Sequence, residues 1–121
     1  MALEHRLQPV ALGPASEERL TRACLNQKIV RTSAATFVWT ADAYRMTYRY
    51  GQRGYRYLHL DAGHVCQNLY LAAETIDCGV CAIAAFDDQE TNALLGLDGA
   101  ERFAVYLATV GKKRHEGEEE K

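Results

Sequence analysis

The sequence predicts a single α+β domain with a small mixed sheet and a long central helix. Apolar residues recur at helical spacing from Tyr55 to Ile76, whereas residues 36–40 and 102–110 form short β-rich runs. The 121 residues, 48% hydrophobic and 25% charged, have room for one hydrophobic core. We expect one domain over residues 1–111 and a charged, disordered tail over residues 112–121, which contain no apolar residue.

The N-terminal part predicts a strand followed by a helix. Apolar residues alternate over His5–Leu12, and Gly13-Pro14 ends this run. Ser16 can cap a helix that carries two glutamates in its first turn, where the helix dipole favours negative charge. The apolar face of this helix extends to a break expected near Asn26.

A second strand and a short helix are predicted next. Thr36–Thr40 is β-rich, lacks helical periodicity and is short enough to be a buried strand. Asp42–Tyr50 can form a short helix, which we expect to end in a break at Gly51 and Gly54.

The long helix is predicted from Tyr55 to Ile76 because one apolar stripe runs along it. Leu60, Tyr70 and Leu71 add apolar surface beside the stripe, more than one neighbouring layer usually covers. Gly63 lies inside the helix at a cost near ~1 kcal/mol relative to alanine. We therefore expect this helix in the core or at the interface of a homodimer. The stripe consists of Leu58, Ala62, Val65, Cys66, Leu69, Ala72, Ala73 and Ile76.

After this helix, the sequence predicts a strand, a helix and a last strand. Cys78-Gly79 is expected to end the long helix, and Val80–Phe86 to run extended. Asp87 followed by Glu90 resembles a capping box for the next helix. The remaining expected features are a helix end at Gly96, a turn at Asp98-Gly99 and a strand at Arg102–Val110.

Charge and hydropathy exclude several classes of function. The net charge of −2 argues against a general nucleic-acid-binding protein. No apolar run approaches the ~20 residues of a membrane span, and the N-terminus lacks a signal-peptide core, so we expect a cytoplasmic protein without membrane contact. One local basic run is interleaved with tyrosines and is interpreted as a packing or dimer surface; it contains Arg45, Arg49, Arg53, Arg56, Tyr44, Tyr48, Tyr50, Tyr55 and Tyr57.

The four cysteines give no metal or redox motif. Cys78 and Cys81 form a single CxxC, but no second pair stands at the spacing of a zinc site. This pair follows a helix and leads into a strand, whereas a thioredoxin-like pair opens a helix. We expect both thiols to be reduced and free of metal. His59 and His64, five residues apart, lie about 140° apart around a helix and do not share a face.

Common catalytic and nucleotide-binding motifs are absent, but a family resemblance is present. The chain contains no GxGxxG, P-loop, GxSxG or HExxH. The segments YRYLHLDAGHVCQNLYLAAETIDCGVCAIAAFDD and FAVYLATVG resemble the C-terminal part of flavin-dependent nitroreductase domains. The similarity is greatest to the SagB-type dehydrogenases, which include azoline-to-azole oxidases. It extends more weakly through EHRLQPVAL, ERLTRACLNQKIV and ATFVWTADAYRMTYRYGQRG.

The resemblance implies a nitroreductase-like fold truncated at its N-terminus. The Arg-Ser-x-Arg-type segment that grips the flavin phosphate in such domains does not occur in this sequence. In the family, FMN lies at the dimer interface, and a backbone N–H after the long helix faces its reactive ring nitrogen. The positions implied for the ring are Ala82, Ile83, Ala84 and Ala85, and those implied for the phosphate are Lys112, Lys113 and Arg114.

Two function classes remain open. One is an FMN-dependent oxidoreductase that takes electrons from NAD(P)H or a substrate, as a homodimer or with a second chain that supplies the missing half. The other is a flavin-free, truncated homologue that acts as a dimerising or interaction module. The sequence names no catalytic residue; Tyr44 and Tyr48 are candidates for lining a substrate pocket.

Overall fold

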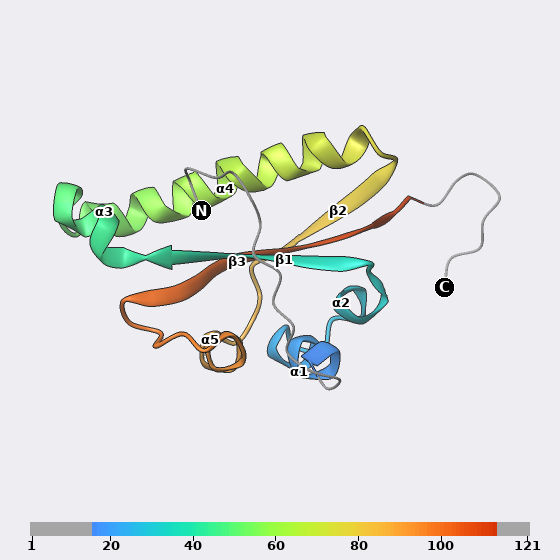
Figure 1. The fold of residues 1–121 in the computed structure, drawn as a ribbon, viewed down its shortest axis with the longest axis horizontal. Coiled ribbons are helices and arrows are strands. Elements are labelled where there is room, and N and C mark those ends of the chain that lie inside the picture. Colours follow the sequence, from blue (N-terminus) through green and yellow to red (C-terminus); the bar gives the residue numbers. More distant parts are fainter. Residues whose placement is uncertain (1–15, 114–121) are drawn as a thin grey trace.

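The computed structural model describes residues 16–113, which form a three-stranded sheet between two helical layers (Figure 1). One long helix, α4, lies along one face of the sheet, and the short helices α1, α2 and α5 lie on the other. The elements are α1 (Ser16–Ala23), α2 (Lys28–Thr32), β1 (Ala35–Asp42), α3 (Ala43–Tyr50), α4 (Arg53–Glu74), β2 (Cys78–Ile83), α5 (Asp88–Leu95) and β3 (Arg102–Lys112).

The sheet has the order β1-β3-β2, and both neighbouring pairs are antiparallel. The prediction of a mixed sheet is therefore wrong for the described residues. β1 and β2 do point the same way, but β3 lies between them and pairs with each in the opposite direction. Every ladder that these three strands form is consequently antiparallel. The strand predicted at His5–Leu12 falls outside the described residues.

The two faces of the sheet carry different cores. Cys24, Val30, Ile83 and Leu107 are buried together on the side of α1 and α2. Because side chains alternate along a strand, Tyr106 points to the opposite face, under α4. There its ring lies 6.1 Å from that of Trp39, centroid to centroid. The central strand β3 thus contributes to both layers.

Local signals at the first helices and the short C-terminal helix behave as predicted. The break near Asn26 is confirmed, since Leu25 and Asn26 both adopt positive φ. Asp87 caps α5 by accepting the N–H of Glu90 at 2.9 Å, and Gly96 ends α5 in the left-handed conformation. These caps act within one turn of chain and need no tertiary contact to form.

The long helix begins earlier and is less buried than predicted. Gly51 ends α3 as expected, but Gly54 lies inside α4, where a Cβ would come within 3.0 Å of Met46. This glycine permits a close approach of α3 and α4 rather than a break. Cys66 and Ala73 are buried, whereas three residues of the predicted stripe, Val65, Ala72 and Ile76, are exposed. A three-stranded sheet covers only a narrow band of this helix.

The turn after α4 is made by a residue that the sequence did not indicate. Asp77 adopts a φ of 57°, and β2 begins directly after it at Cys78. Cys78-Gly79 therefore starts the strand instead of ending the helix, and the strand ends at Ile83 instead of Phe86. None of the helices in the described part of the chain is both long and apolar enough to cross a membrane.

Candidate functional site

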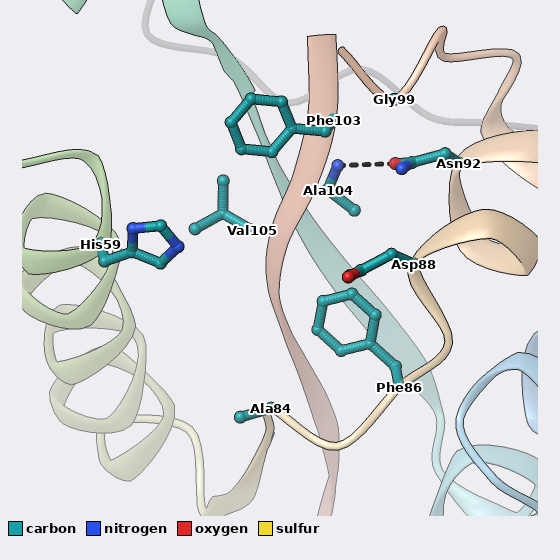
Figure 2. A pocket seen from close by; sticks show the side chains of 9 residues that line it. All are labelled: His59, Ala84, Phe86, Asp88, Asn92, Gly99, Phe103, Ala104 and Val105. Atoms are coloured by element: carbon teal, nitrogen blue, oxygen red, sulfur yellow. Dashed lines mark hydrogen bonds between the residues drawn. The ribbon is translucent and has the colours of Figure 1, made fainter. Parts of the chain in front are cut away.

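A cavity of about 400 Å³ opens beside the end of β2, between α4 and α5 (Figure 2). His59 reaches it from α4, and Asp88 and Asn92 reach it from α5. The remaining wall is mostly apolar and belongs to β3 and the segment after β2. A largely apolar cavity with a few polar groups is the usual form of a small-molecule site. The other lining residues are Ala84, Phe86, Gly99, Phe103, Ala104 and Val105.

The cavity exists because β2 is shorter than β3. The β2–β3 ladder stops at the pair Ile83 and Leu107, whereas β3 continues to pair with β1 as far as Arg102. Among residues 16–113, no strand pairs with this part of β3 on its β2 side. Asn92 partly replaces one: its buried Oδ1 accepts the N–H of Ala104 at 2.8 Å. The space beyond Asn92 is the cavity.

His59 presents one ring nitrogen to this cavity. Its Nδ1 lies 2.7 Å from the carbonyl oxygen of Tyr55, so Nδ1 carries the proton of this hydrogen bond. In the neutral ring, Nε2 is then a free acceptor, and Figure 2 shows the ring directed toward Val105. From the sequence, His59 was a candidate only for a metal ligand. Among residues 16–113 no group of three or more metal-binding side chains comes together.

In the segment predicted to contact a cofactor ring, the first two residues make contacts within the protein and the last two leave their backbone N–H groups unpaired with the described residues. Ile83 is 2% exposed, and its side chain belongs to the core below the sheet. The N–H of Ala82 donates to the hydroxyl of Tyr70 at 3.0 Å, which fixes α4 against the outer edge of β2. These two residues anchor the segment.

In the second half of this segment, Ala84 and Ala85, the backbone N–H groups remain available as hydrogen-bond donors. Gln27 donates to the carbonyl of Ala85 at 2.9 Å and holds the chain as it leaves the sheet. The N–H groups of Ala84 and Ala85 make no hydrogen bond to the described residues. Ala84 lines the cavity, so its backbone donor lies at the cavity edge, and Ala85 follows it directly in the chain.

The predicted phosphate-binding lysines lie at the other end of the β2–β3 pair. Lys112 is exposed and sits opposite Cys78, about 17 Å along the strand from Leu107. Lys113 forms a salt bridge with Glu74 at the end of α4, and its N–H donates to the carbonyl of Asp77. Arg114 falls outside the described residues. The fold therefore separates the two predicted groups along the sheet.

The cysteines show no arrangement for thiol chemistry. Cys78 and Cys81 are three residues apart on one strand, so their side chains point to opposite faces of the sheet. Burial raises the pKa of the Cys24 and Cys66 thiols, which favours the unreactive protonated form. Tyr44 and Tyr48, the predicted pocket tyrosines, are exposed on α3 and line neither this cavity nor a buried cleft.

Sequence reasoning missed the contribution of α5 to the cavity. Asn92 is an amide on the buried side of a short helix, between Thr91 and Leu94, which are also buried. A polar residue inside such an apolar pattern is the signal that could have identified it, because buried amides need partners. The partner itself, Ala104, lies twelve residues away and could not be named from the sequence.

Comparisons with known proteins agree on one family. The family model described as "Nitroreductase family" matches residues 2–112. A Methanocaldococcus jannaschii protein named as a candidate nitroreductase is 34% identical over 94 residues, which are 78% of this chain and 46% of that protein. The chain thus spans about half the length of this relative.

Solved structures share the fold. A candidate nitroreductase from Anabaena variabilis superposes with a TM-score of 0.73 at 37% identity, over 84% of this chain and 20% of that one. The NADPH:FMN oxidoreductase of Vibrio harveyi, solved with NAD⁺, gives a TM-score of 0.70 at 21% identity, over 88% of this chain and 49% of that one.

Proposed function

Because the chain belongs to the nitroreductase family, we propose that it is an FMN-dependent oxidoreductase of the SagB-type branch. It transfers electrons from NAD(P)H or a substrate through FMN at a dimer interface. The observation that carries this proposal is the pair of backbone N–H groups at Ala84 and Ala85 beside the cavity. Bound FMN would supply the redox chemistry, while the protein supplies position and electrostatics.

The residues present fit the ring better than the phosphate. Alanines at positions 82, 84 and 85 let a flat ring approach the main chain. The N–H groups of Ala84 and Ala85 can then donate hydrogen bonds to this ring. Lys112 is exposed and can bind a phosphate by a charge-assisted hydrogen bond. Lys113 must first leave Glu74 to do the same. We infer that this chain alone holds the phosphate weakly.

In this proposal, the side chains that line the cavity have specific roles. Phe86, Phe103 and Val105 form an apolar wall that excludes water from the end of β2. Nε2 of His59 accepts a hydrogen bond from a substrate donor in the cavity. Asn92 has its Oδ1 engaged with Ala104 and keeps the open edge of β3 in place.

The proposal includes a second subunit. A second copy of this chain, or another chain that carries the other half of the family domain, would cover α4 and complete the phosphate site. The alternative function is a flavin-free homologue that serves as a dimerising or interaction module. The salt bridge between Lys113 and Glu74 favours this alternative, because it occupies one of the expected phosphate ligands.

Titration with FMN separates the two functions. Purified protein is titrated to millimolar FMN, following flavin fluorescence and then NAD(P)H oxidation. Lys112→Glu should weaken FMN binding about tenfold or more, since one charged hydrogen bond is worth roughly 1.5–3 kcal/mol. Lys28 on α2 is also exposed, so Lys28→Glu is the matched control and should bind as the wild type does. Neither binding nor turnover at millimolar FMN would leave only the interaction module.

A further inference from the structure

We propose that the cavity between α4 and α5 binds an organic ammonium cation with an aromatic body, that is, an arylalkylamine. The proposal rests on the oxidoreductase function only where it names this cation as the class of substrate. The binding itself requires no FMN. What selects the cation is the sign of charge and the chemistry of the side chains that line the cavity.

The carboxylate of Asp88 gives this cavity a negative wall. Among residues 16–113, no Lys or Arg lines the cavity, and this carboxylate makes no hydrogen bond or ion pair with the described residues. Figure 2 shows the Asp88 side chain directed toward β3, beside the ring of Phe86. A carboxylate in this position attracts a cation and repels an anion.

The chain around the cavity reinforces this sign of charge. Residues 84–101, which contain α5 and the turn after it, include no Lys or Arg. Arg102 follows directly, but its Nε lies 3.8 Å from a carboxylate oxygen of Asp42. A cleft whose surroundings carry one sign of charge concentrates ligands of the opposite sign. The acidic residues of this segment are Asp87, Asp88, Glu90, Asp98 and Glu101.

Two aromatic rings offer a cation further contacts. Phe86 and Phe103 both line the cavity, and within the described residues neither ring stacks on another ring or carries a cation. The face of a phenyl ring is negative because of its π electrons, so it attracts an ammonium group. Ala84 and Val105 supply apolar surface for the aromatic body of the ligand.

His59 adds a hydrogen-bond acceptor on the α4 side of the cavity. Its Nδ1 is engaged with the carbonyl of Tyr55, so Nε2 of the neutral ring can accept an N–H or O–H of the ligand. Arg56, three residues earlier, is exposed and does not line the cavity. His59 lies about 100° around α4 from Leu60. The cavity therefore opens beside the expected dimer surface at Leu60 and is not buried under it.

NMR titration of ¹⁵N-labelled, flavin-free protein tests the selection by charge. The ligands are 2-phenylethylammonium, the neutral 2-phenylethanol and the anionic phenylacetate, which are similar in size. We expect the ammonium to bind about tenfold more tightly than the alcohol, the combined effect of an exposed ion pair and a cation–π contact. Phenylacetate should bind more weakly than both. The amide signals of Ala84 and Val105 should shift because both residues line the cavity.

Two variants assign the preference to one carboxylate. Asp88→Asn keeps the size of the side chain but removes its charge, and it should abolish the preference for the ammonium over the alcohol. Glu90→Gln removes the same charge from the same turn of α5, outside the cavity, and should keep most of the preference. Circular dichroism verifies that both variants are folded, and the comparison of ligands on the wild type needs no variant.

Each other outcome decides against the proposal. It is overturned if the three ligands bind equally, if both variants lose the preference alike, or if millimolar ammonium leaves the signals of Ala84 and Val105 unchanged. It is also overturned if FMN displaces the ammonium, which would assign the cavity to the flavin itself. Ammonium binding without FMN binding would remove the oxidoreductase proposal and leave the cation site. FMN-dependent turnover without selection by charge would have the reverse meaning.

Discussion

At the residue scale, Asn92 links three parts of the site. Its Oδ1 accepts the N–H of Ala104, and its carbonyl accepts the N–H of Leu97 at 2.8 Å. Its amide also lies beside Gly99, where an added Cβ would be 3.3 Å from Nδ2. One side chain thus ties α5 to the open edge of β3 and to the turn that precedes it.

Replacing this amide should be costly. In Asn92→Ala, the buried N–H of Ala104 loses its acceptor, and an unsatisfied buried donor costs roughly 1–3 kcal/mol. Asn68→Ala on the exposed side of α4 is the matched control and should change stability by at most about 0.5 kcal/mol. Urea unfolding followed by circular dichroism measures both. Equal midpoints for the two variants would contradict the role given to Asn92.

Asp98 makes the same turn sensitive to acid. Its Oδ1 accepts the N–H groups of Arg102, Ala100 and Glu101, each at 2.9 Å, and these bonds hold the pKa of the carboxyl below its ordinary value of 3.8. A carboxyl whose pKa is lower in the folded state stabilises the fold above its unfolded pKa, and this stabilisation is lost as pH falls through the folded pKa.

The expected result is a variant that responds less to acid. Between neutral pH and values below 3.8, the unfolding free energy of the wild type should fall more steeply than that of Asp98→Asn, which keeps an acceptor oxygen but cannot titrate. Asp88→Asn, on the exposed first turn of α5, serves as a control for general charge removal. Parallel pH profiles for wild type and Asp98→Asn would exclude this contribution.

At the element scale, the sequence predicted the helices and strands whose ends are set by local chemistry. Asp87 and Gly96 cap α5 through contacts within a turn, and Gly51 ends α3 in the same way. The start of β2 could not be predicted, because Asp77 adopts a positive φ without being a glycine. The burial of α4 also depends on how wide a sheet lies beneath it, which periodicity alone does not reveal.

A substitution at Gly54 tests whether the close contact between α3 and α4 is needed for stability. In Gly54→Ala, the new Cβ meets the backbone carbon and oxygen of Met46 at 3.0 Å, and backbone cannot move aside as a flexible side chain can. We expect a loss of about 1–3 kcal/mol in stability, the usual cost of overpacking. Urea unfolding checks this value. An unchanged or higher stability would show that the two helices can separate freely.

Replacing Gly63, on the same helix, should have the opposite effect on stability. Apart from its two chain neighbours and the nearby backbone of α4 itself, no atom of the described residues lies within 4 Å of the Cβ position, so alanine meets open space. In a monomer, Gly63→Ala should stabilise the protein by about 1 kcal/mol through helix propensity. In a dimer that packs against this side of α4, it should instead weaken association. Measuring stability at low and high protein concentration distinguishes the two cases.

At the scale of the whole molecule, the arrangement of the proposed site could not be predicted from the sequence. Ala82–Ala85 and Lys112–Lys113 were identified from family motifs, yet they occupy opposite ends of the β2–β3 pair. The cavity beside Ala84 depends on β2 ending opposite Leu107 and on α5 turning back to β3. Such contacts arise from tertiary packing and have no signature in a single sequence.

The outer face of α4 carries exposed apolar side chains. Leu60 and Leu71 are 53% and 59% exposed, and their spacing of eleven residues, three helical turns, places them on one side of the helix. Gly63 lies beside this line and would allow a second backbone to approach closely. Exposed apolar residues aligned along one helix are typical of an interface. We therefore expect a homodimer in which two α4 helices pack against each other.

Light scattering and sedimentation at micromolar concentration test this arrangement. The wild type should have twice the mass of the chain, and Leu60→Glu with Leu71→Glu should give monomers, because two buried carboxylates would face their own copies across the symmetric interface. Leu25→Glu is the matched control: Leu25 is 60% exposed in the loop after α1, away from α4, and should leave the dimer intact. A monomeric wild type would exclude the dimer, and dissociation by Leu25→Glu alone would move the interface to the opposite face of the sheet.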